Sequence, residues 1–357
     1  MNNAIFILTD VPIEISRLHV CTWDLHGDGL IEIGVEFGSD DWWQKNKQTS
    51  KLGFIMSLPF VRAEDKVLCL AHTLVGENNA NSKFVFNDTV TTTHTIKDEP
   101  ANGSILEFRQ RDPLAILPIY DIKREDGRLS FSVNNLDILG DKICQGKTSA
   151  YIRLLIMTKL ENFVLKHSGI AKTSYLYDMK INEMRNLPNQ INQYLNNGKY
   201  ICKTISSCFC MHVVPRDYHV SYTDSNKLKN IRILESEAFN RYLPQIKSSD
   251  NEYLILFQKD KREHDQTKKS IVSDSYSFFT EFEKERIGNE QIIISIGVNL
   301  FCSLLIGIGM LNNQVRTDSW YNRWEVWGFV IAFGSLFLYL IIPWTRIWHR
   351  IKRWWKR

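Results

Sequence analysis

The sequence lacks the short motifs that mark the common catalytic and metal sites. It contains no G-x-S-x-G elbow, no H-E-x-x-H motif and no C-x-x-C pair. Those motifs are the local signatures of many serine hydrolases, zinc proteases and zinc-binding modules. Internal repeats and low-complexity tracts are also missing from the sequence. We therefore expect no catalytic residue, no cofactor, no bound metal and no enzymatic activity.

Cysteine is present, but its pattern does not predict disulfides. The chain has an odd number of cysteines, scattered at positions 21, 69, 144, 202, 208, 210 and 302. Its first residues lack the basic segment followed by a long apolar run that directs a chain to export. We expect reduced thiols and a cytoplasmic N-terminal side.

Excess charge is confined to the C-terminal end. The formal net charge is +4, and residues 345–357 carry six basic side chains. Without those six, residues 1–311 have a net charge of about −2, because the charges between positions 312 and 325 cancel. This balance argues against a general nucleic-acid-binding face, so we expect no direct nucleic-acid binding.

Two apolar runs near the C-terminal end predict a transmembrane hairpin over residues 291–344. Residues 292–311 are twenty positions without a charged side chain, enough for a helix to cross a hydrocarbon core of about 30 Å. Residues 326–344 form a second uncharged run. Trp324, Trp327 and Trp344 stand where aromatic side chains meet the two membrane interfaces.

The tail of residues 345–357 predicts the orientation of that hairpin. Basic residues beside a span stay in the cytoplasm, so both termini are expected there, in a multi-pass protein of the plasma membrane. Aromatic and basic side chains also suit the headgroup layer of an anionic leaflet, with nucleic-acid binding as the alternative. The expected membrane-interface residues of the tail are Arg346, Trp348, Arg350, Lys352, Arg353, Trp354, Trp355, Lys356 and Arg357.

Small residues recur at four-residue spacing within both runs. Ser303 precedes Gly307, and Gly328 precedes Ala332, a spacing that lets helix backbones approach closely. Asn299 adds an amide that would seek a partner on another helix. We predict that these five residues form an assembly face, within one hairpin or between copies of the chain. The alternative is that glycine is simply frequent in membrane helices.

Residues 1–147 carry the signals of a β-rich domain. Apolar and other residues alternate over positions 31–37, which is typical of a half-buried strand. Glycine-containing turns near positions 26–29 and 125–127 predict two hairpins. We predict an antiparallel sandwich or barrel, with further strands at residues 54–61, 66–75, 83–96 and 105–109.

Residues 148–258 predict a mixed α and β region. Apolar residues at positions 152, 155, 156, 160, 163 and 164 follow one face of a helix over residues 150–167. Residues 259–290 are predicted to form a charged linker and a juxtamembrane helix over residues 271–286. The expected fold class is α+β, ending in the two-helix hairpin. Further elements are expected as strands at residues 174–180, 200–214 and 253–257 and helices at residues 189–195 and 235–242.

Two clusters suggest phosphate or metal chemistry but have simpler interpretations. Gly146-Lys147-Thr148 precedes the expected helix as in a phosphate-binding loop, but Gly140 stands one residue too far upstream, which favours a capped helix start. A second set of residues could approach zinc from one strand, although free cysteines usually pack as small apolar side chains. This set comprises Cys202, Cys208, Cys210, His212 and His219.

Other polar clusters are expected at the surface. Asp40-Asp41-Trp42-Trp43 suggests either a partner surface or a capped helical turn that buries one indole. His26 with Asp24 and Asp28, and His264 with Asp265, are neighbours in sequence alone. Turns and solvated linkers collect such residues, so neither group predicts acid–base catalysis.

The predicted layout resembles the two-transmembrane effectors of bacterial anti-phage systems of the retron and cyclic-nucleotide-signalling types. The resemblance covers architecture and no individual motif. It implies an abortive-infection toxin of the bacterial inner membrane, which an inhibitory protein or ribonucleoprotein partner silences or a ligand triggers. The hairpins of several copies would then assemble and disrupt the membrane. The alternatives are a membrane-anchored binding or adaptor subunit without toxicity, and a membrane-tethered enzyme that the sequence does not reveal.

Overall fold

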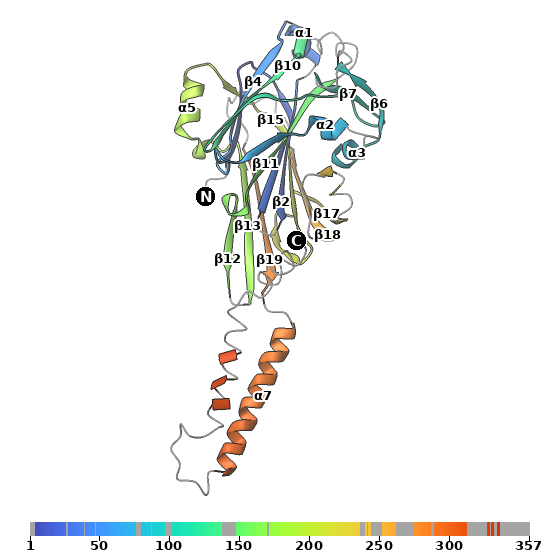
Figure 1. Cartoon of the computed structure of the whole chain (residues 1–357). Coiled ribbons are helices and arrows are strands. Elements are labelled where there is room, and N and C mark those ends of the chain that lie inside the picture. The colour runs from blue at the N-terminus through green and yellow to red at the C-terminus, as the bar shows by residue number, and fades with distance from the viewer. Residues whose placement is uncertain are drawn as a thin grey trace. The chain divides into compact units, whose positions relative to one another are not determined.

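The computed structural model consists of two compact units (Figure 1). The first comprises Met1–Ser168 and Ser174–Lys284, and the second comprises Gly169–Thr173 and Glu285–Arg357. The structure describes residues 4–25, 28–38, 40–46, 48–75, 80–86, 88–96, 102–137, 148–169, 171–235, 240, 242–243, 252–261, 275–286, 289–312, 327–328, 330–331 and 334–335.

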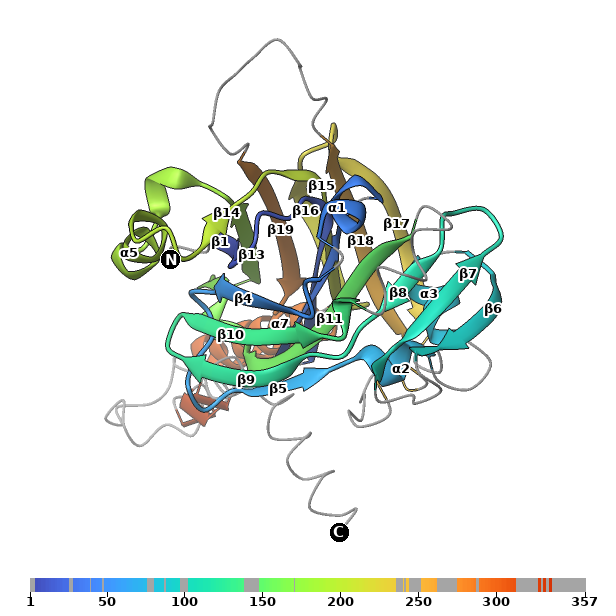
Figure 2. The same cartoon turned by 90° about the horizontal axis from the view of Figure 1, so that it is seen from above.

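One sheet of the first unit has nine strands. In spatial order its main path is β16 (Tyr218–Thr223), β19 (Tyr276–Glu285), β13 (Lys172–Ile181), β1 (Ala4–Thr9), β4 (Lys51–Ser57), β10 (Arg128–Asn134) and β9 (Tyr120–Glu125). The short strands β12 (Val164–Ser168) and β14 (Ile201–Cys202) pair with β13 and β1. Seen from above, β4, β10 and β9 lie next to one another (Figure 2).

The other sheet has ten strands and carries the candidate site. Its main path is β17 (Leu228–Glu235), β18 (Glu252–Lys261), β15 (Ile205–Pro215), β2 (Ile15–Leu25), β3 (Asp28–Phe37), β11 (Ser149–Lys159), β8 (Leu114–Ile116), β7 (Ser104–Phe108) and β6 (Val90–Thr95). Strand β5 (Lys66–Cys69) also pairs with β11. The path places β17 at the edge of this sheet.

The predicted fold class is wrong, because most of the described residues form β-strands and both sheets are mixed. Strand β1 runs parallel to β13, β2 runs parallel to β15, and β11 runs parallel to β8. Each of these parallel pairs joins segments that lie far apart in sequence. An antiparallel N-terminal domain followed by an α/β region therefore does not describe the molecule, since strands from both halves alternate within each sheet.

The main core lies between the two sheets. It contains Ile5 and Ile7 from the nine-stranded sheet together with Val20, Val35 and Leu256 from the ten-stranded sheet. A second core lies on the other face of the ten-stranded sheet, where helix α2 (Ala71–Val75) and Tyr242 pack. A third core lies under helix α5 (Asn189–Asn196). The centre of the ten-stranded sheet is thus buried on both faces.

Burial on both faces explains why the helix predicted over residues 150–167 is wrong. Residues 149–159 form β11, and Ala150–Ile156 are all buried. A strand covered on both faces has no polar alternation, so its apolar residues can be fitted to a helical period as well. Residues 164–168 form β12.

Four other predicted elements are wrong or partly wrong. Residues 276–285 form β19 instead of a juxtamembrane helix, with Tyr276, Phe278 and Phe282 buried at the two-residue period of a strand. Parts of the strands predicted at residues 66–75 and 83–96 are helical, in α2 and α3 (Ala80–Phe86). Strand β18 extends to Lys261, into the predicted linker. The predicted hairpin of residues 17–37 is confirmed by the pairing of β2 with β3.

The C-terminal hairpin and the multi-pass membrane location are also contradicted. Residues 289–312 form helix α7 (Asn289–Asn312) in the second unit. The second apolar run is described at only six positions, 327–328, 330–331 and 334–335. Among the residues that the structure describes, no helix meets the combined demands of length and apolarity for crossing a bilayer.

Candidate functional site

A row of basic and aromatic side chains lies on one face of the ten-stranded sheet. Register places Arg17 of β2, Ser207 of β15 and Lys261 of β18 opposite one another. The next row along the strands is His19, Phe209 and Lys259. Residues directly opposed on neighbouring strands project from the same face of a sheet, so these side chains share one surface.

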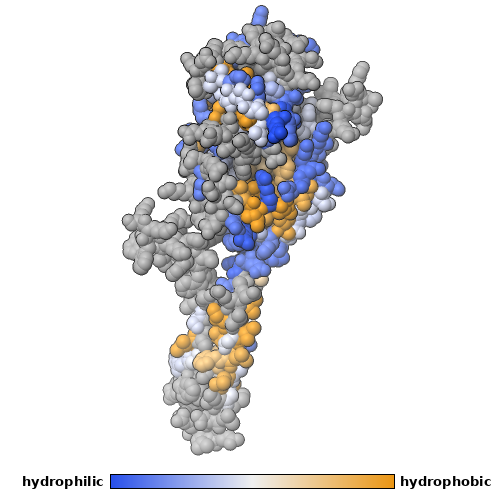
Figure 3. Space-filling model, turned by 90° about the vertical axis from the view of Figure 1, so that its right-hand side faces the viewer, coloured by the Kyte–Doolittle hydropathy of each residue, from blue (hydrophilic) through white to orange (hydrophobic). Residues whose placement is uncertain are grey.

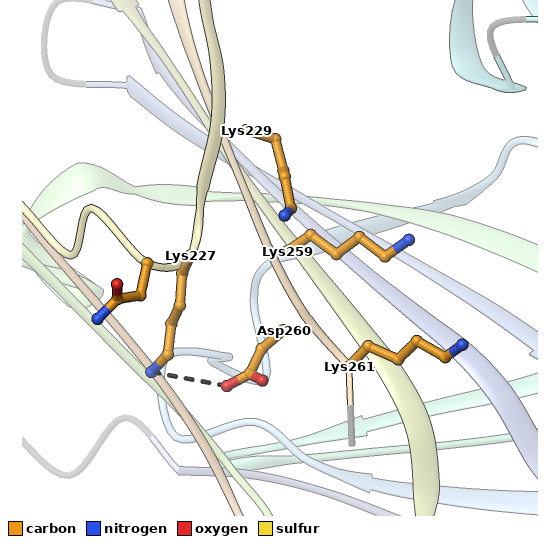
Figure 4. Close-up of a pocket in the computed structure, with 6 residues that line it drawn as sticks. Lys227, Lys229, Lys259, Asp260 and Lys261 are labelled. Atoms are coloured by element: carbon orange, nitrogen blue, oxygen red, sulfur yellow. Dashed lines mark ion pairs between the residues drawn. The ribbon is translucent and has the colours of Figure 1, made fainter. Parts of the chain in front are cut away.

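The edge strand adds Lys229 to this surface. Lys229 lies where the pairing of β17 with β18 shifts register, between Leu228 and Asn230. Lys229, Lys259 and Lys261 line a hollow of about 430 Å³ together with Asn226, Lys227 and Asp260, and we call this hollow the lysine groove. Figure 4 shows Lys259 and Lys261 extending to one side of β18 and Asp260 to the other.

Three of the four lysines that line the groove, Lys229, Lys259 and Lys261, carry charge that no carboxylate neutralises in the described part of the chain. Their neighbour Lys227 differs, because its Nζ lies 3.5 Å from Asp224 and 3.6 Å from Asp260. No ion pair between described residues involves Lys229, Lys259 or Lys261. Partial burial lowers the pKa of Lys259, and the nearby charges of Arg17, Lys261 and Lys229 lower it further. The groove is therefore a local centre of positive potential.

Two stacked phenylalanine rings lie next to Lys259 on the same face of the sheet. Phe209 and Phe257 stack with their ring centres 5.8 Å apart and an angle of 16° between their planes. The Lys259 ammonium lies 5.0 Å from the centre of the Phe209 ring, and His19 contacts that ring edge-on. Both phenylalanines are half-buried. The surface thus combines cations with flat apolar rings.

Comparison with known proteins gives no indication of which ligand this surface binds. No protein-family model matches the chain. A comparison with curated proteins finds no match either. Its function must therefore be inferred from its own residues.

Next to the lysine groove, the same sheet face holds a buried ion pair. The Arg153 Nε donates to Glu32 Oε2 at 2.7 Å, and both side chains are almost fully buried. Trp23 Nε1 and Tyr242 OH also donate to the Glu32 carboxylate, each at 2.7 Å. Arg153 donates in turn to the Tyr151 hydroxyl at 3.0 Å. The Glu32 carboxylate and the Arg153 guanidinium both have hydrogen-bond partners, which is typical of a structural ion pair.

The predicted zinc residues do not converge. Cys208, Cys210 and His212 lie on the inner face of β15, in the main core or beside it, whereas His219 is exposed on β16. Among the described residues, no three His, Cys, Asp or Glu side chains are grouped to hold a metal ion. Burial raises the pKa values of Cys208 and Cys210, so both thiols stay protonated at neutral pH. Free-cysteine packing is the better account.

The other polar clusters have structural partners or lie outside the described residues. Asp24 is buried and accepts a hydrogen bond from Tyr218 OH at 2.6 Å. In helix α1 (Asp40–Lys45), the Trp42 indole donates to the Pro12 carbonyl at 2.7 Å and Trp43 is buried. The predicted positions outside the described residues are His26, Gly140, Gly146, Lys147, His264 and Asp265.

The predicted assembly residues are placed in part. Asn299, Ser303 and Gly307 lie exposed on α7, where the Ser303 hydroxyl donates to the Asn299 carbonyl at 2.9 Å. Nothing lies within 4 Å of where a Cβ on Gly307 would be. Gly328 is helical, and Trp327 is 57% exposed. The remaining predicted positions lie outside the described residues, namely Trp324, Ala332, Trp344 and all of 345–357.

Sequence reasoning missed the lysine groove. The sequence pattern places Lys259 and Lys261 in a solvated linker and Phe209 in a packed strand. One local signal was available, since Lys259, Asp260 and Lys261 continue the alternation of the preceding strand. Long-range strand register brings Lys229, Arg17 and Phe209 close to Lys259. No local sequence pattern indicates that they are neighbours.

Proposed function

We propose that this protein is a self-assembling effector rather than an enzyme, and that copies of the chain associate through α7. The observation that carries this proposal is the apolar surface of that helix (Figure 3). Residues 291–312 contain no charge. Seven of their described apolar side chains are 42–67% exposed: Ile292, Ile294, Ile296, Leu300, Phe301, Leu304 and Ile306.

Such a surface has a high free energy in water. Covering the exposed parts of seven large apolar side chains is favourable by on the order of 5–10 kcal/mol per helix. Soluble proteins rarely leave contiguous apolar surface of this kind uncovered, and such patches usually mark interaction sites. A partner for α7 is therefore expected.

The distribution of the exposed side chains favours several copies over one docking groove. At about 100° per residue, positions 292–306 spread the seven side chains over an arc of about 240°. A helix laid in a groove is covered along one side. In a bundle of identical helices, each helix has a neighbour on two sides, so the whole arc is covered.

The available area and the lack of charge agree with this arrangement. A helix of 24 residues is roughly 36 Å long and 10 Å wide, so two-thirds of its side is on the order of 750 Å². Stable interfaces bury about 800 Å² on each partner. Identical helices in parallel place like residues together, and residues 291–312 bring no like charges into contact.

Light scattering on the purified full-length chain tests the proposal. We expect an oligomer at micromolar concentration and a monomer after combining Leu300→Lys with Leu304→Lys, because the new charges repel across every helix contact. Met184→Lys is the matched control, since Met184 is an exposed apolar residue of the first unit, which contains both sheets and which we call the β unit. This control should remain oligomeric.

Two results would contradict self-assembly. One is an oligomer that survives the paired lysine substitutions unchanged. The other is a wild-type monomer whose α7 becomes protected from hydrogen exchange when phospholipid vesicles are added, which would make lipid the partner. The predicted role in anti-phage defence remains a prediction, and growth after induced expression of the wild-type and paired-lysine chains would test toxicity.

A further inference from the structure

We propose that the lysine groove and the adjoining Phe209 ring bind the phosphates and a base of a nucleotide-containing ligand. This proposal does not depend on assembly through α7, because every residue it uses lies in the β unit. It departs from the expectation that the chain binds no nucleic acid. That expectation rested on net charge, which averages over a local cluster of cations.

The arrangement of the lysines fits a ligand with more than one phosphate. Lys259 and Lys261 stand two residues apart on β18, about 7 Å along the strand, so their ammonium groups can contact different phosphates. Lys229 approaches from β17, and the charge of Arg17 acts on Lys259 from β2. Lysine ammonium groups act as point charges that suit phosphate oxygens.

The Phe209 ring distinguishes nucleotides from other polyanions. Bases stack on half-exposed aromatic rings, and such stacking is largely independent of base identity. Phe209 is directly opposite Lys259 in the register of β15 and β18, so one ligand can contact both a ring and a cation. A polyphosphate or an acidic peptide uses the lysines but gains nothing from the ring.

The size of the groove is compatible with one nucleotide or a short segment of a strand. Its volume of about 430 Å³ lies within the range of small-molecule sites, about 300–1,000 Å³. Two sources share this chemistry, a small nucleotide and a single-stranded nucleic acid. Competition experiments distinguish these sources.

Fluorescence anisotropy with a labelled single-stranded oligothymidylate and the full-length protein tests the proposal. Three lysine–phosphate contacts predict that log K falls against log salt with a slope of about −2. Lys259→Glu should weaken binding by about tenfold or more and flatten the slope by roughly 0.7. Lys123→Glu is the matched control, because Lys123 is exposed on β9 of the other sheet. This control should bind as the wild type does.

A second variant tests the role of the Phe209 ring. A third is a substitute for Lys259→Glu in case that variant does not fold. Phe209→Leu should weaken oligothymidylate binding several-fold and leave inorganic polyphosphate binding unchanged. Lys261→Glu, at an exposed strand end, replaces Lys259→Glu if that chain does not fold. Unlabelled thymidine triphosphate that competes as well as the oligonucleotide identifies a small nucleotide as the ligand source, and weaker competition identifies the strand.

Three outcomes would overturn the nucleotide assignment. The first is no binding at low salt. The second is equal loss of binding in Lys123→Glu and Lys259→Glu, which means diffuse attraction instead of a site. The third is polyglutamate competing as strongly as the oligonucleotide, which makes an acidic polypeptide the ligand. The Leu300→Lys and Leu304→Lys chain should bind normally, so failure of assembly and failure of this site are separable.

Discussion

Replacing Arg153 with methionine is expected to lower the free energy of unfolding by about 3–5 kcal/mol, because it leaves the buried Glu32 carboxylate without its counter-ion. Glu32 is inaccessible to solvent and Arg153 is 2% exposed. Methionine keeps much of the apolar volume of the arginine stem. The measurement is urea unfolding of the full chain at neutral pH, followed by tryptophan fluorescence.

The reason for the loss can be isolated by a second substitution. In the combined Arg153→Met and Glu32→Gln chain, no unpaired charge remains, and the glutamine oxygen can still accept from Trp23 or Tyr242. We expect this double variant to regain on the order of 2 kcal/mol relative to Arg153→Met alone. A double variant no more stable than Arg153→Met would show that lost packing, not an unpaired charge, causes the effect.

An exposed ion pair provides the matched control. Arg185 donates from Nε to Glu183 at 2.8 Å, but its side chain is 87% exposed. Water solvates both groups when the pair is broken, so Arg185→Met should leave the urea midpoint nearly unchanged. A midpoint shift as large as that of Arg153→Met would contradict the argument that burial makes the difference.

Glu32 also shows where prediction of the fold from sequence succeeds and where it fails. The alternation of Ile31, Ile33 and Val35 with other residues predicts β3 correctly. The same pattern places Glu32 on a solvated face, whereas the structure buries it beside Arg153. Local periodicity identifies a strand, but the cover on its second face comes from α2 and Tyr242, which are distant in sequence.

The errors at residues 150–167 and 271–286 share a physical cause. Strands buried on both faces, or with aromatic residues on both sides, lose the two-residue alternation that separates them from helices. In β19, Phe278 and Phe282 are buried, and Phe279 lies between them on the opposite face. These three residues fit a helical face in sequence, and pairing with β16 and β13 is what makes this segment a strand.

The candidate sites differ in how far the sequence predicts them. The uncharged composition of residues 292–311 predicts a helix, and this prediction is confirmed by α7. The predicted pairing of this helix with a second one in a hairpin is wrong. The lysine groove was not recognised, because Lys229, Lys259 and Arg17 come from three separate strands. Their approach is a consequence of mixed sheet topology, for which single-sequence patterns carry no signal.

Acid is expected to destabilise this protein through His212. Burial lowers the pKa of this imidazole to about 3, from an ordinary value of 6.5. Between those values the unfolded chain binds a proton at His212 and the folded chain does not, so stability falls as the pH falls. At 1.36 kcal/mol per pKa unit, His212 alone should remove about 2.5 kcal/mol between pH 7 and pH 4.5.

The surroundings of His212 explain why it stays neutral. Its Nδ1 lies 2.8 Å from Thr22 Oγ1 on β2, and its Nε2 lies 3.6 Å from Cys210 Sγ on its own strand. The Tyr177 ring of β13 and the Phe282 ring of β19 pack against it. None of these four groups carries a negative charge that would favour the imidazolium form at acidic or neutral pH.

His212→Phe provides the test, because it keeps a ring in the core and removes the titrating group. Urea unfolding at several pH values should give a variant whose stability depends less steeply on pH, by up to about 1.4 kcal/mol per pH unit below pH 6. Burial and the charges of Arg153, Arg17 and Arg111 lower the pKa of His19 too. The variant should therefore keep a residual slope of the same sign.

A control must separate a general loss of stability in His212→Phe from the loss of the titrating imidazole. Val214→Ala is the matched control, since Val214 is a buried residue on the same face of β15. This change should lower stability by about 1–2 kcal/mol at every pH and keep the wild-type slope. If His212→Phe and the wild type lose stability equally between pH 7 and pH 4.5, His212 is protonated in the folded chain or shielded from titration in the unfolded one. Either result would show that the buried imidazole does not set the acid sensitivity of this core.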